Sequence, residues 1–186
     1  MAEADRRRWD ERYATMAAPA ARQIAAPAVW RRHAQRFPTS GAALELACGQ
    51  GAASVWLALR GLTVLGVDIS AVAIGQARDL ARRAGVGGRC RFEVTDLDGG
   101  LPAGPPADVV VCHMFWDRRL GRAIVERLAP GGLLAITVLS EVGAAPGPYR
   151  AARGELADVY GDLEALAAGE ADGRAWLLAR GRGPSA

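Results

Sequence analysis

Residues 43–51 read A-L-E-L-A-C-G-Q-G, and the rest of the chain is organised around this stretch. The apolar run before the glycines predicts a buried strand, and a helical pattern begins at Ala52. Gly49 and Gly51 can adopt a positive φ and let a ligand approach the backbone without meeting a Cβ. The helix that follows presents unpaired N–H groups at the same place. The stretch therefore predicts a strand, a ligand-binding turn and a helix N-terminus.

Two acidic residues stand beside this turn. Glu45 lies just before it, within reach of a cationic group on a bound ligand. The second predicted strand, T-V-L-G-V-D, ends in Asp68, about 17 positions after Gly51. In a βαβ unit, an acidic residue roughly 20 positions beyond a glycine turn is placed to hydrogen-bond ribose hydroxyls. The pattern therefore favours a ligand that carries a ribose.

E-L-A-C-G-Q-G followed by G-V-D-I-S resembles the class I S-adenosylmethionine-dependent methyltransferases, and the resemblance extends from Trp9 to about Leu178. In that family the glycine turn runs under the amino-acid end of the cofactor, and the acid that ends the second strand holds its ribose. The resemblance implies an α/β fold with a Rossmann-like, doubly wound, seven-stranded sheet, mostly parallel with an antiparallel last strand. The family usually has Gly where this chain has Ala47, which we expect to tighten the turn without removing the site.

The resemblance also implies cofactor contacts outside the turn. W-D-E-R-Y, residues 9–13, matches an element that covers the cofactor pocket, with Tyr13 or Arg12 near the cofactor's carboxylate. Simple docking of this helix on the body is the compatible alternative. After the third strand, Asp96 and Leu97 match an acid and an apolar residue that contact the adenine, although Asp96 also suits a turn or a helix cap. The full set of expected cofactor-binding residues is Trp9, Arg12, Tyr13, Glu45, Ala47, Cys48, Gly49, Gly51, Asp68, Ile69, Asp96, Leu97 and Cys112.

The fourth predicted strand, A-D-V-V-V-C, ends in H-M-F-W-D-R, where the resembling family brings the transferring methyl to its acceptor. His113 is the expected catalytic residue, with a satisfied core histidine as the alternative. The expected substrate-binding residues are Met114, Phe115, Trp116 and Tyr149. The pattern V-V-V-C-H-M-F-W-D-R-R-L looks closest to the tellurite-resistance and thiopurine-type branches, which methylate small molecules.

Length and composition limit the kind of protein that this sequence can encode. The length of 186 residues predicts one methyltransferase domain, with N-terminal helices in 1–40 over the pocket and a Rossmann-like core in 41–180. The net charge of +3 is too small to indicate nucleic-acid binding, so we expect a small-molecule substrate and a monomer or homodimer. No apolar run approaches the ~18 residues of a membrane span, and the polar N-terminus does not look like a signal peptide. Three Cys without C-x-x-C spacing predict neither a metal site nor disulfides, and a cytoplasmic protein is expected.

Several alternatives remain beside an S-adenosylmethionine-dependent methyltransferase of small molecules with S-adenosylhomocysteine as product. A nicotinamide-dependent oxidoreductase needs G-x-G-x-x-G, and its usual Tyr–Lys pair is excluded because the chain contains no Lys. Enzymes that methylate base amino groups carry D/N-P-P-Y/F after the fourth strand, where this chain reads C-H-M-F. Other nucleic-acid or protein methyltransferases, and a protein that binds the cofactor without turnover, stay open.

Overall fold

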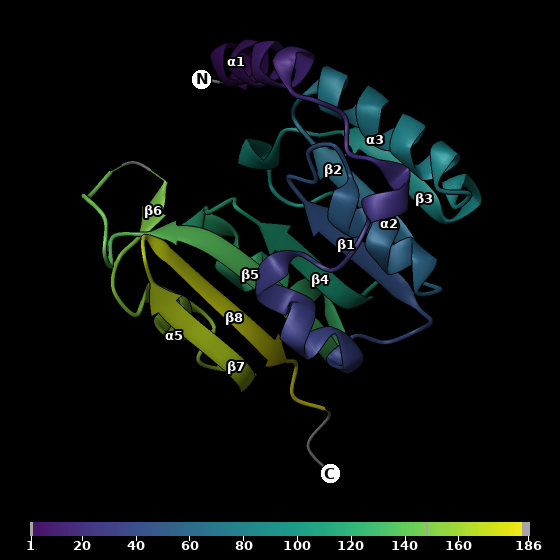
Figure 1. The fold of residues 1–186 in the computed structure, drawn as a ribbon. Coiled ribbons are helices and arrows are strands. Elements are labelled where there is room, and N and C mark those ends of the chain that lie inside the picture. The colour runs from purple at the N-terminus through teal and green to yellow at the C-terminus, as the bar shows by residue number, and fades with distance from the viewer. Residues whose placement is uncertain (1, 148, 184–186) are drawn as a thin grey trace. The chain divides into compact units, whose positions relative to one another are not determined.

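The computed structural model describes residues 2–147 and 149–183. The chain separates into two compact units, residues 1–102 and residues 103–186 (Figure 1). Each unit is built around its own set of paired strands and is described by itself. In the part of the chain that the structure describes, no helix has both the length and the apolar composition that a bilayer span requires.

Three parallel strands form the sheet of the first unit. They are β1 (Ala42–Leu46), β2 (Thr63–Asp68) and β3 (Cys90–Val94), with β2 in the centre. The register pairs Leu46 with Val67, so β1 and β2 end side by side and Asp68 follows at the shared carboxyl edge. Strands of a parallel sheet are covered on both faces, which is why β1 and β2 read as nearly continuous apolar runs.

Two helices connect these strands. α2 (Ala52–Leu59) joins β1 to β2, α3 (Ala71–Arg83) joins β2 to β3, and the two helices contact each other. Serine is a favoured N-cap residue, and Ser70 caps α3: its Oγ accepts a hydrogen bond from Ala73 N at 3.1 Å. The predicted strand–turn–helix–strand unit is therefore confirmed. Its buried cluster consists of Cys48, Val55, Ile74, Ala77, Leu80, Ala81 and Phe92.

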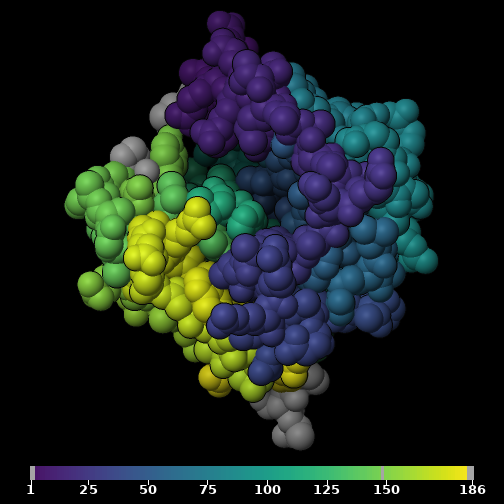
Figure 2. Space-filling model, in the orientation of Figure 1, coloured from purple at the N-terminus to yellow at the C-terminus, as the bar shows by residue number. Residues whose placement is uncertain are grey.

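The N-terminal segment packs on this unit. α1 (Ala2–Thr15) contacts α3, and in Figure 2 its purple atoms lie directly against the teal atoms of α3. Two 3₁₀ helices follow, η1 (Ala21–Gln23) and η2 (Ala28–Arg36). The sequence predicts an α-helix where η2 lies. Only Trp30 of η2 is buried, so one aromatic anchor rather than an apolar stripe of period 3.6 holds this segment.

The second unit combines parallel and antiparallel strands. β4 (Ala107–His113) pairs in parallel with β5 (Leu128–Ser140), which pairs antiparallel with β8 (Arg174–Arg180), and β7 (Glu164–Ala171) pairs antiparallel with β8. A-D-G at residues 171–173 is a hairpin turn signal between the last two predicted strands, and the pairing of β7 with β8 confirms it. Asp172 and Gly173 at the turn both have positive φ, 51° and 73°.

Short elements fill the connections. The α-helices are α4 (Gly121–Arg127) and α5 (Glu155–Val159), and the remaining 3₁₀ helices are η3 (Gly87–Arg89), η4 (Leu97–Gly99) and η5 (Arg118–Leu120). The predicted α/β class with an antiparallel last strand is confirmed. One strand was not predicted: β6 (Arg150–Ala151) pairs with β5, and two residues are too few to show a periodicity.

The segment L-A-P-G-G also differs from the prediction. The pattern L-A-P-G-G-L-L, residues 128–134, resembles the helix-to-strand turn of the methyltransferase family, but β5 already begins at Leu128. The register against β4 shifts between Ala107 and Val109, and Gly131 has a φ of 72°. The proline and glycines thus form a bulge inside a long strand, because a bulge needs the same backbone freedom as a turn.

Candidate active site

The turn between β1 and α2 has a left-handed backbone. Ala47, Gly49 and Gly51 have φ values of 49°, 51° and 77°. Cys48 N donates to Val67 O at 2.9 Å, which ties the turn to the end of β2. A left-handed conformation strains any residue with a Cβ, so the position of Ala47 favours the glycine that the resembling family usually has. The turn keeps its shape with Ala47 at the cost of local strain.

Asp68 fixes this turn from the end of β2. Its Oδ2 accepts from Gly49 N at 2.8 Å, its Oδ1 accepts from Ser70 N at 2.9 Å, and the residue is only 5% exposed. Burial raises the pKa of the Asp68 carboxyl, and the two backbone hydrogen bonds oppose that rise. Each carboxylate oxygen has a second lone pair, so the group can hold the turn and still accept a hydroxyl from a ligand.

Glu45 is enclosed rather than open to solvent. Ser54 Oγ donates a hydrogen bond to Glu45 Oε2, and the residue is 3% exposed. Burial raises the pKa of the Glu45 carboxyl to about 7, although the Ser54 hydrogen bond works against the rise. The sequence predicts that Glu45 meets a ligand cation; in this structure its partner is a hydroxyl of the chain itself.

α1 carries an aromatic side chain onto the turn. A Cβ built on Gly49 would lie 2.7 Å from Tyr13 Oη, so the phenol lies directly against this glycine and would have to shift for a larger residue. Burial raises the pKa of Tyr13 to about 12, and the charge of Asp68 acts in the same direction. Trp9 stacks on Tyr13 with ring centroids 5.9 Å apart, and the Arg12 guanidinium lies 5.2 Å from the Trp9 ring centre. The structure thus brings Tyr13 to the turn and gathers Trp9 and Arg12 beside it.

Asp10 attaches α1 to the beginning of α3. Its Oδ1 accepts from Ser70 Oγ at 2.5 Å and from Val72 N at 3.2 Å. A carboxylate near a helix N-terminus satisfies unpaired N–H groups and favours the helix dipole. Sequence reasoning missed Asp10, because no periodicity links a residue of α1 to one about 60 positions later.

Two glutamines connect α1 with the glycine turn. Gln50, inside the turn, donates from Nε2 to Ala17 O at 3.2 Å and to Gln76 Oε1 at 3.1 Å. Gln76, on α3, donates from Nε2 to Tyr13 O at 3.0 Å. The residue at the centre of the turn is therefore hydrogen-bonded to the end of the N-terminal segment. Sequence reasoning missed this network, since isolated glutamines are common on protein surfaces.

The end of β3 supports the cap interpretation of Asp96. Its Oδ1 accepts from Asp98 N at 2.9 Å and caps η4, while Leu97 is 7% exposed. An adenine contact by these two residues stays a proposal. Cys48 is buried, and Ile69 is half-buried next to Asp68.

In the second unit, His113 ends β4. Burial lowers the pKa of its imidazole, and the positive charge of Arg174 lowers it further. The imidazole is therefore neutral near pH 7 and able to accept a proton. Its Nδ1 is enclosed and has no hydrogen-bond partner among the described residues.

A strained turn follows His113. Met114 has a φ of 64° and is 40% exposed. Met114 N donates to Thr137 O at 2.7 Å, and Cys112 Sγ lies 3.1 Å from Phe115 O. A long side chain in the left-handed region costs on the order of 1–3 kcal/mol, and such strain concentrates at functional sites. The end of β4 thus presents Met114 and the imidazole at the carboxyl edge of the strand.

The other two predicted acceptor residues differ in exposure. Trp116 is 9% exposed, which suits a core position, whereas Tyr149 is 62% exposed. Tyr149 directly precedes β6, which pairs with β5 at Leu139, so it lies at the same end of β5 as the partner of His113. Any contact of these residues with a substrate stays a proposal.

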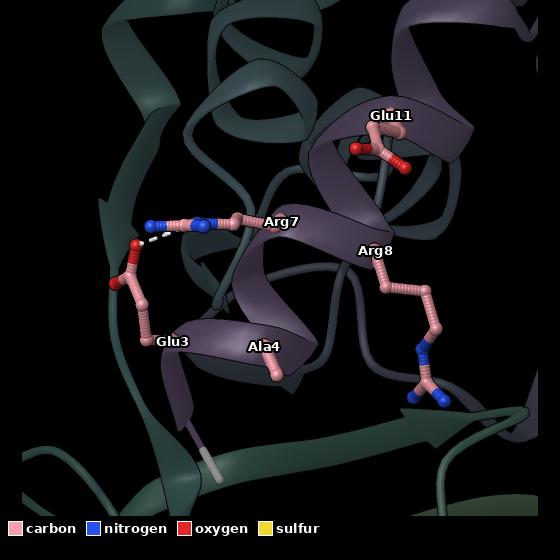
Figure 3. A pocket seen from close by; sticks show the side chains of 5 residues that line it. All are labelled: Glu3, Ala4, Arg7, Arg8 and Glu11. Atoms are coloured by element: carbon pink, nitrogen blue, oxygen red, sulfur yellow. Dashed lines mark hydrogen bonds and ion pairs between the residues drawn. The ribbon is translucent and has the colours of Figure 1, made fainter.

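A hollow on the exposed side of α1 has different chemistry (Figure 3). Its lining comes from this helix alone, and Arg7 Nε donates to Glu3 Oε1 at 3.2 Å. Exposed ion pairs of this kind contribute little to stability. None of the lining residues is a predicted site residue, and we give this surface no role. They are Glu3, Ala4, Arg7, Arg8 and Glu11.

Residues 43–132, which include the glycine turn, Asp68 and His113, match a family model described as a methyltransferase domain. Over these residues the chain is similar to methyltransferase domains. A curated relative is the ribosomal RNA small subunit methyltransferase C of Alcanivorax borkumensis, 33% identical over 114 residues. That match covers 55% of this chain but only 33% of the relative, so the chain spans about a third of that protein's length.

Solved structures share the fold. TehB from Haemophilus influenzae superposes with a TM-score of 0.71 at 22% identity and covers 81% of this chain and 61% of its own. The CcbJ methyltransferase from Streptomyces caelestis also has a TM-score of 0.71, at 16% identity, and covers 93% of this chain and 96% of its own. The predicted resemblance to class I methyltransferases and the Rossmann-like fold are thus confirmed.

Proposed function

We propose that the chain is an S-adenosylmethionine-dependent methyltransferase that acts on a small molecule. The observation that carries the proposal is the left-handed turn at Gly49. Asp68 Oδ2 accepts a hydrogen bond from Gly49 N, and the Tyr13 phenol lies against this glycine. This arrangement combines a close backbone approach, an acidic hydroxyl acceptor and an aromatic cover within one unit. A ligand with a ribose at one end and an amino acid at the other suits all three.

The residues fit the cofactor in their chemistry. Asp68 retains lone pairs for the ribose hydroxyls, and the enclosed Glu45 offers a carboxyl whose raised pKa would fall beside an ammonium group. Arg12 is exposed next to the turn and suits a carboxylate. When bound, the cofactor supplies a methyl group that is already electrophilic because it is attached to a sulfonium.

The chain's own residues then have few chemical tasks. They hold the acceptor in line with the methyl carbon, exclude water, and take a proton where the acceptor must lose one. Neutral His113 at the end of β4 suits that last task. Met114 and Phe115 beside it offer apolar contact for a small acceptor. The similarity to TehB and CcbJ is a similarity of fold and does not identify the methyl acceptor. The acceptor has to be identified by an activity assay.

Cofactor binding is tested first, by thermal unfolding with S-adenosylhomocysteine, NAD or NADP. A ligand that binds only the folded state raises the melting temperature. We expect a rise with S-adenosylhomocysteine alone. Asp68→Ala should weaken calorimetric affinity by about 1.5–3 kcal/mol, the scale of a hydrogen bond to a charged group. A rise with NAD and none with S-adenosylhomocysteine would refute the proposal.

The acceptor is then sought with radiolabelled methyl donor over a panel of thiols, phenols, amines and chalcogen anions. The name of the Alcanivorax relative raises ribosomal RNA as a second candidate acceptor, so small-subunit RNA belongs in the same panel. The absence of D/N-P-P-Y/F at residues 112–115 argues against amino groups of bases. Transfer to RNA but to no small molecule would replace the acceptor class while leaving the cofactor assignment intact.

A further inference from the structure

Several enclosed polar atoms of the second unit have no hydrogen-bond partner in the described parts of the chain, and two of them lie on adjacent strands: His113 Nδ1 and Thr137 Oγ1. Leaving a buried polar atom unpaired costs about 1–3 kcal/mol. Buried polar groups in native proteins are nearly always paired, so two unpaired groups on adjacent strands call for an explanation.

The strand register puts these two side chains together. β4 and β5 run parallel, and His113 is the direct partner of Thr137. Directly opposed residues of neighbouring strands project from the same face, with Cβ atoms about 5 Å apart. A rotation of the short threonine side chain about its Cα–Cβ bond can therefore bring Oγ1 to the imidazole. Met114 N, which donates to Thr137 O at 2.7 Å, holds the two backbones together just beyond this pair.

The neighbour on the other side offers Thr137 no competing partner. Trp176 on β8 opposes Thr137, but its indole lies toward β7: a Cβ built on Gly169 would be 2.5 Å from Trp176 Nε1. The charged group that acts on His113 is the Arg174 guanidinium, a donor only, which cannot accept the proton of an imidazole nitrogen.

The two ring nitrogens of His113 differ in their surroundings. Nδ1 is enclosed, whereas Nε2 is not. The strand partner of His113 is Thr137. A base needs the same arrangement, with one nitrogen held by the protein and the other turned outward.

We propose that Thr137 is a positioning residue for His113: its hydroxyl oxygen accepts the Nδ1–H, so that the lone pair of the imidazole is on Nε2. The catalytic role of this hydrogen bond rests on the proposed methyl transfer, whereas the tautomer of His113 can be measured without any methyl transfer. The acceptor's X–H bond breaks as X bonds to the methyl carbon, and the proton goes to Nε2. The methyl–sulfur bond breaks with its electron pair left on sulfur, which becomes a neutral thioether, and the imidazolium later releases the proton to water.

The tautomer is measured in the free protein by ¹⁵N NMR of the histidine side chains at a pH above their titration. The chain has two histidines, so His33→Gln leaves a single signal to assign. We expect a protonated Nδ1 and an unprotonated Nε2. Thr137→Val removes the hydroxyl at constant shape and should give a mixture of tautomers, and Thr137→Ser should restore the single one.

A proton on Nε2 in the parent protein would overturn the proposal, even if Thr137→Val does not fold. An unchanged tautomer in folded Thr137→Val would overturn it as well.

Kinetics provide the second test, once an acceptor is known. Thr137→Val should lower kcat about tenfold with KM for the cofactor unchanged, and Thr137→Ser should recover most of the loss. Equal kcat in Thr137→Val and the parent would refute the positioning role. If no acceptor is methylated, the proposed function fails, but the tautomer measurement still decides what Thr137 does to His113.

Discussion

Ala47 shows how one residue can depart from a family pattern without losing the local fold. Its φ of 49° is a conformation in which a Cβ costs about 1–2 kcal/mol. Glycine removes that strain, but it also lowers the free energy of unfolding by about 0.4–1 kcal/mol because the unfolded chain gains conformational entropy. We therefore expect Ala47→Gly to raise the free energy of unfolding by roughly 0.5–1 kcal/mol.

Urea unfolding measures this change. Ala157→Gly is the matched control, since Ala157 is exposed within α5 and its substitution should lower the free energy of unfolding. A loss of stability in both variants would mean that the backbone at position 47 is not left-handed.

Glu45 gives the molecule a pH-dependent stability whose sign follows from burial. The folded pKa is about 7, above the ordinary value of 4.5, so the folded state keeps a proton that the unfolded state loses. The free energy of unfolding is therefore highest, as far as Glu45 is concerned, below pH 4.5. It falls progressively as the pH rises from 4.5 to about 7. The full difference is on the order of 3 kcal/mol.

Glu45→Gln keeps a neutral hydrogen-bonding group beside Ser54 at every pH. Its stability relative to the parent should therefore increase between pH 5 and pH 8, measured by urea unfolding at each pH. Glu164→Gln, at an exposed position of β7, should show no such trend. A pH-independent difference for Glu45→Gln would contradict a raised pKa.

At the scale of elements, polar contacts attach the N-terminal helix to the first unit. An isolated helix of this length is marginal in water. α1 is held by Asp10 at the start of α3 and by the Gln50 and Gln76 amides. Bound cofactor should stabilise this arrangement, because Tyr13 lies on the turn that the cofactor approaches.

Limited trypsin digestion tests this coupling, since α1 contains several arginines. S-adenosylhomocysteine should protect residues 1–20, and Asp10→Ala should increase cleavage there and weaken cofactor binding. Glu11→Ala, at an exposed site on the same helix, should behave like the parent. Deleting residues 1–16 should weaken binding while the rest still folds. Equal cleavage with and without ligand would leave α1 as ordinary packing.

Elements with strong local signals were predictable, and those fixed by tertiary contacts were not. The apolar run before Gly49, the cap at Ser70 and the Asp172–Gly173 hairpin each have a short-range cause. η2, β6 and the bulge in β5 depend on one buried side chain, on pairing with a distant strand and on register. The same distinction holds at the site: the turn and Asp68 were found from spacing, whereas Asp10 and Thr137 are visible only through partners far along the chain.

For the whole molecule, the proposed roles separate along the chain. Every proposed cofactor residue except Cys112 falls in the unit of residues 1–102, whereas His113 and the proposed acceptor residues fall in the unit of 103–186. Each unit has its own paired strands, so a ligand bound to one need not stabilise the other equally. S-adenosylhomocysteine should therefore slow amide exchange most in residues 2–17, at the turn of 47–51 and in 68–76.

Hydrogen exchange followed by mass spectrometry resolves these segments directly. Exchange in β7 and β8 should change little, which provides an internal control within the same sample. Asp68→Ala should reduce the protection at the turn more than elsewhere, because it removes the acceptor of Gly49 N. Uniform protection of both units would show that the cofactor stabilises the molecule as one cooperative body. Protection confined to 103–186 would contradict the assignment of the cofactor to the first unit.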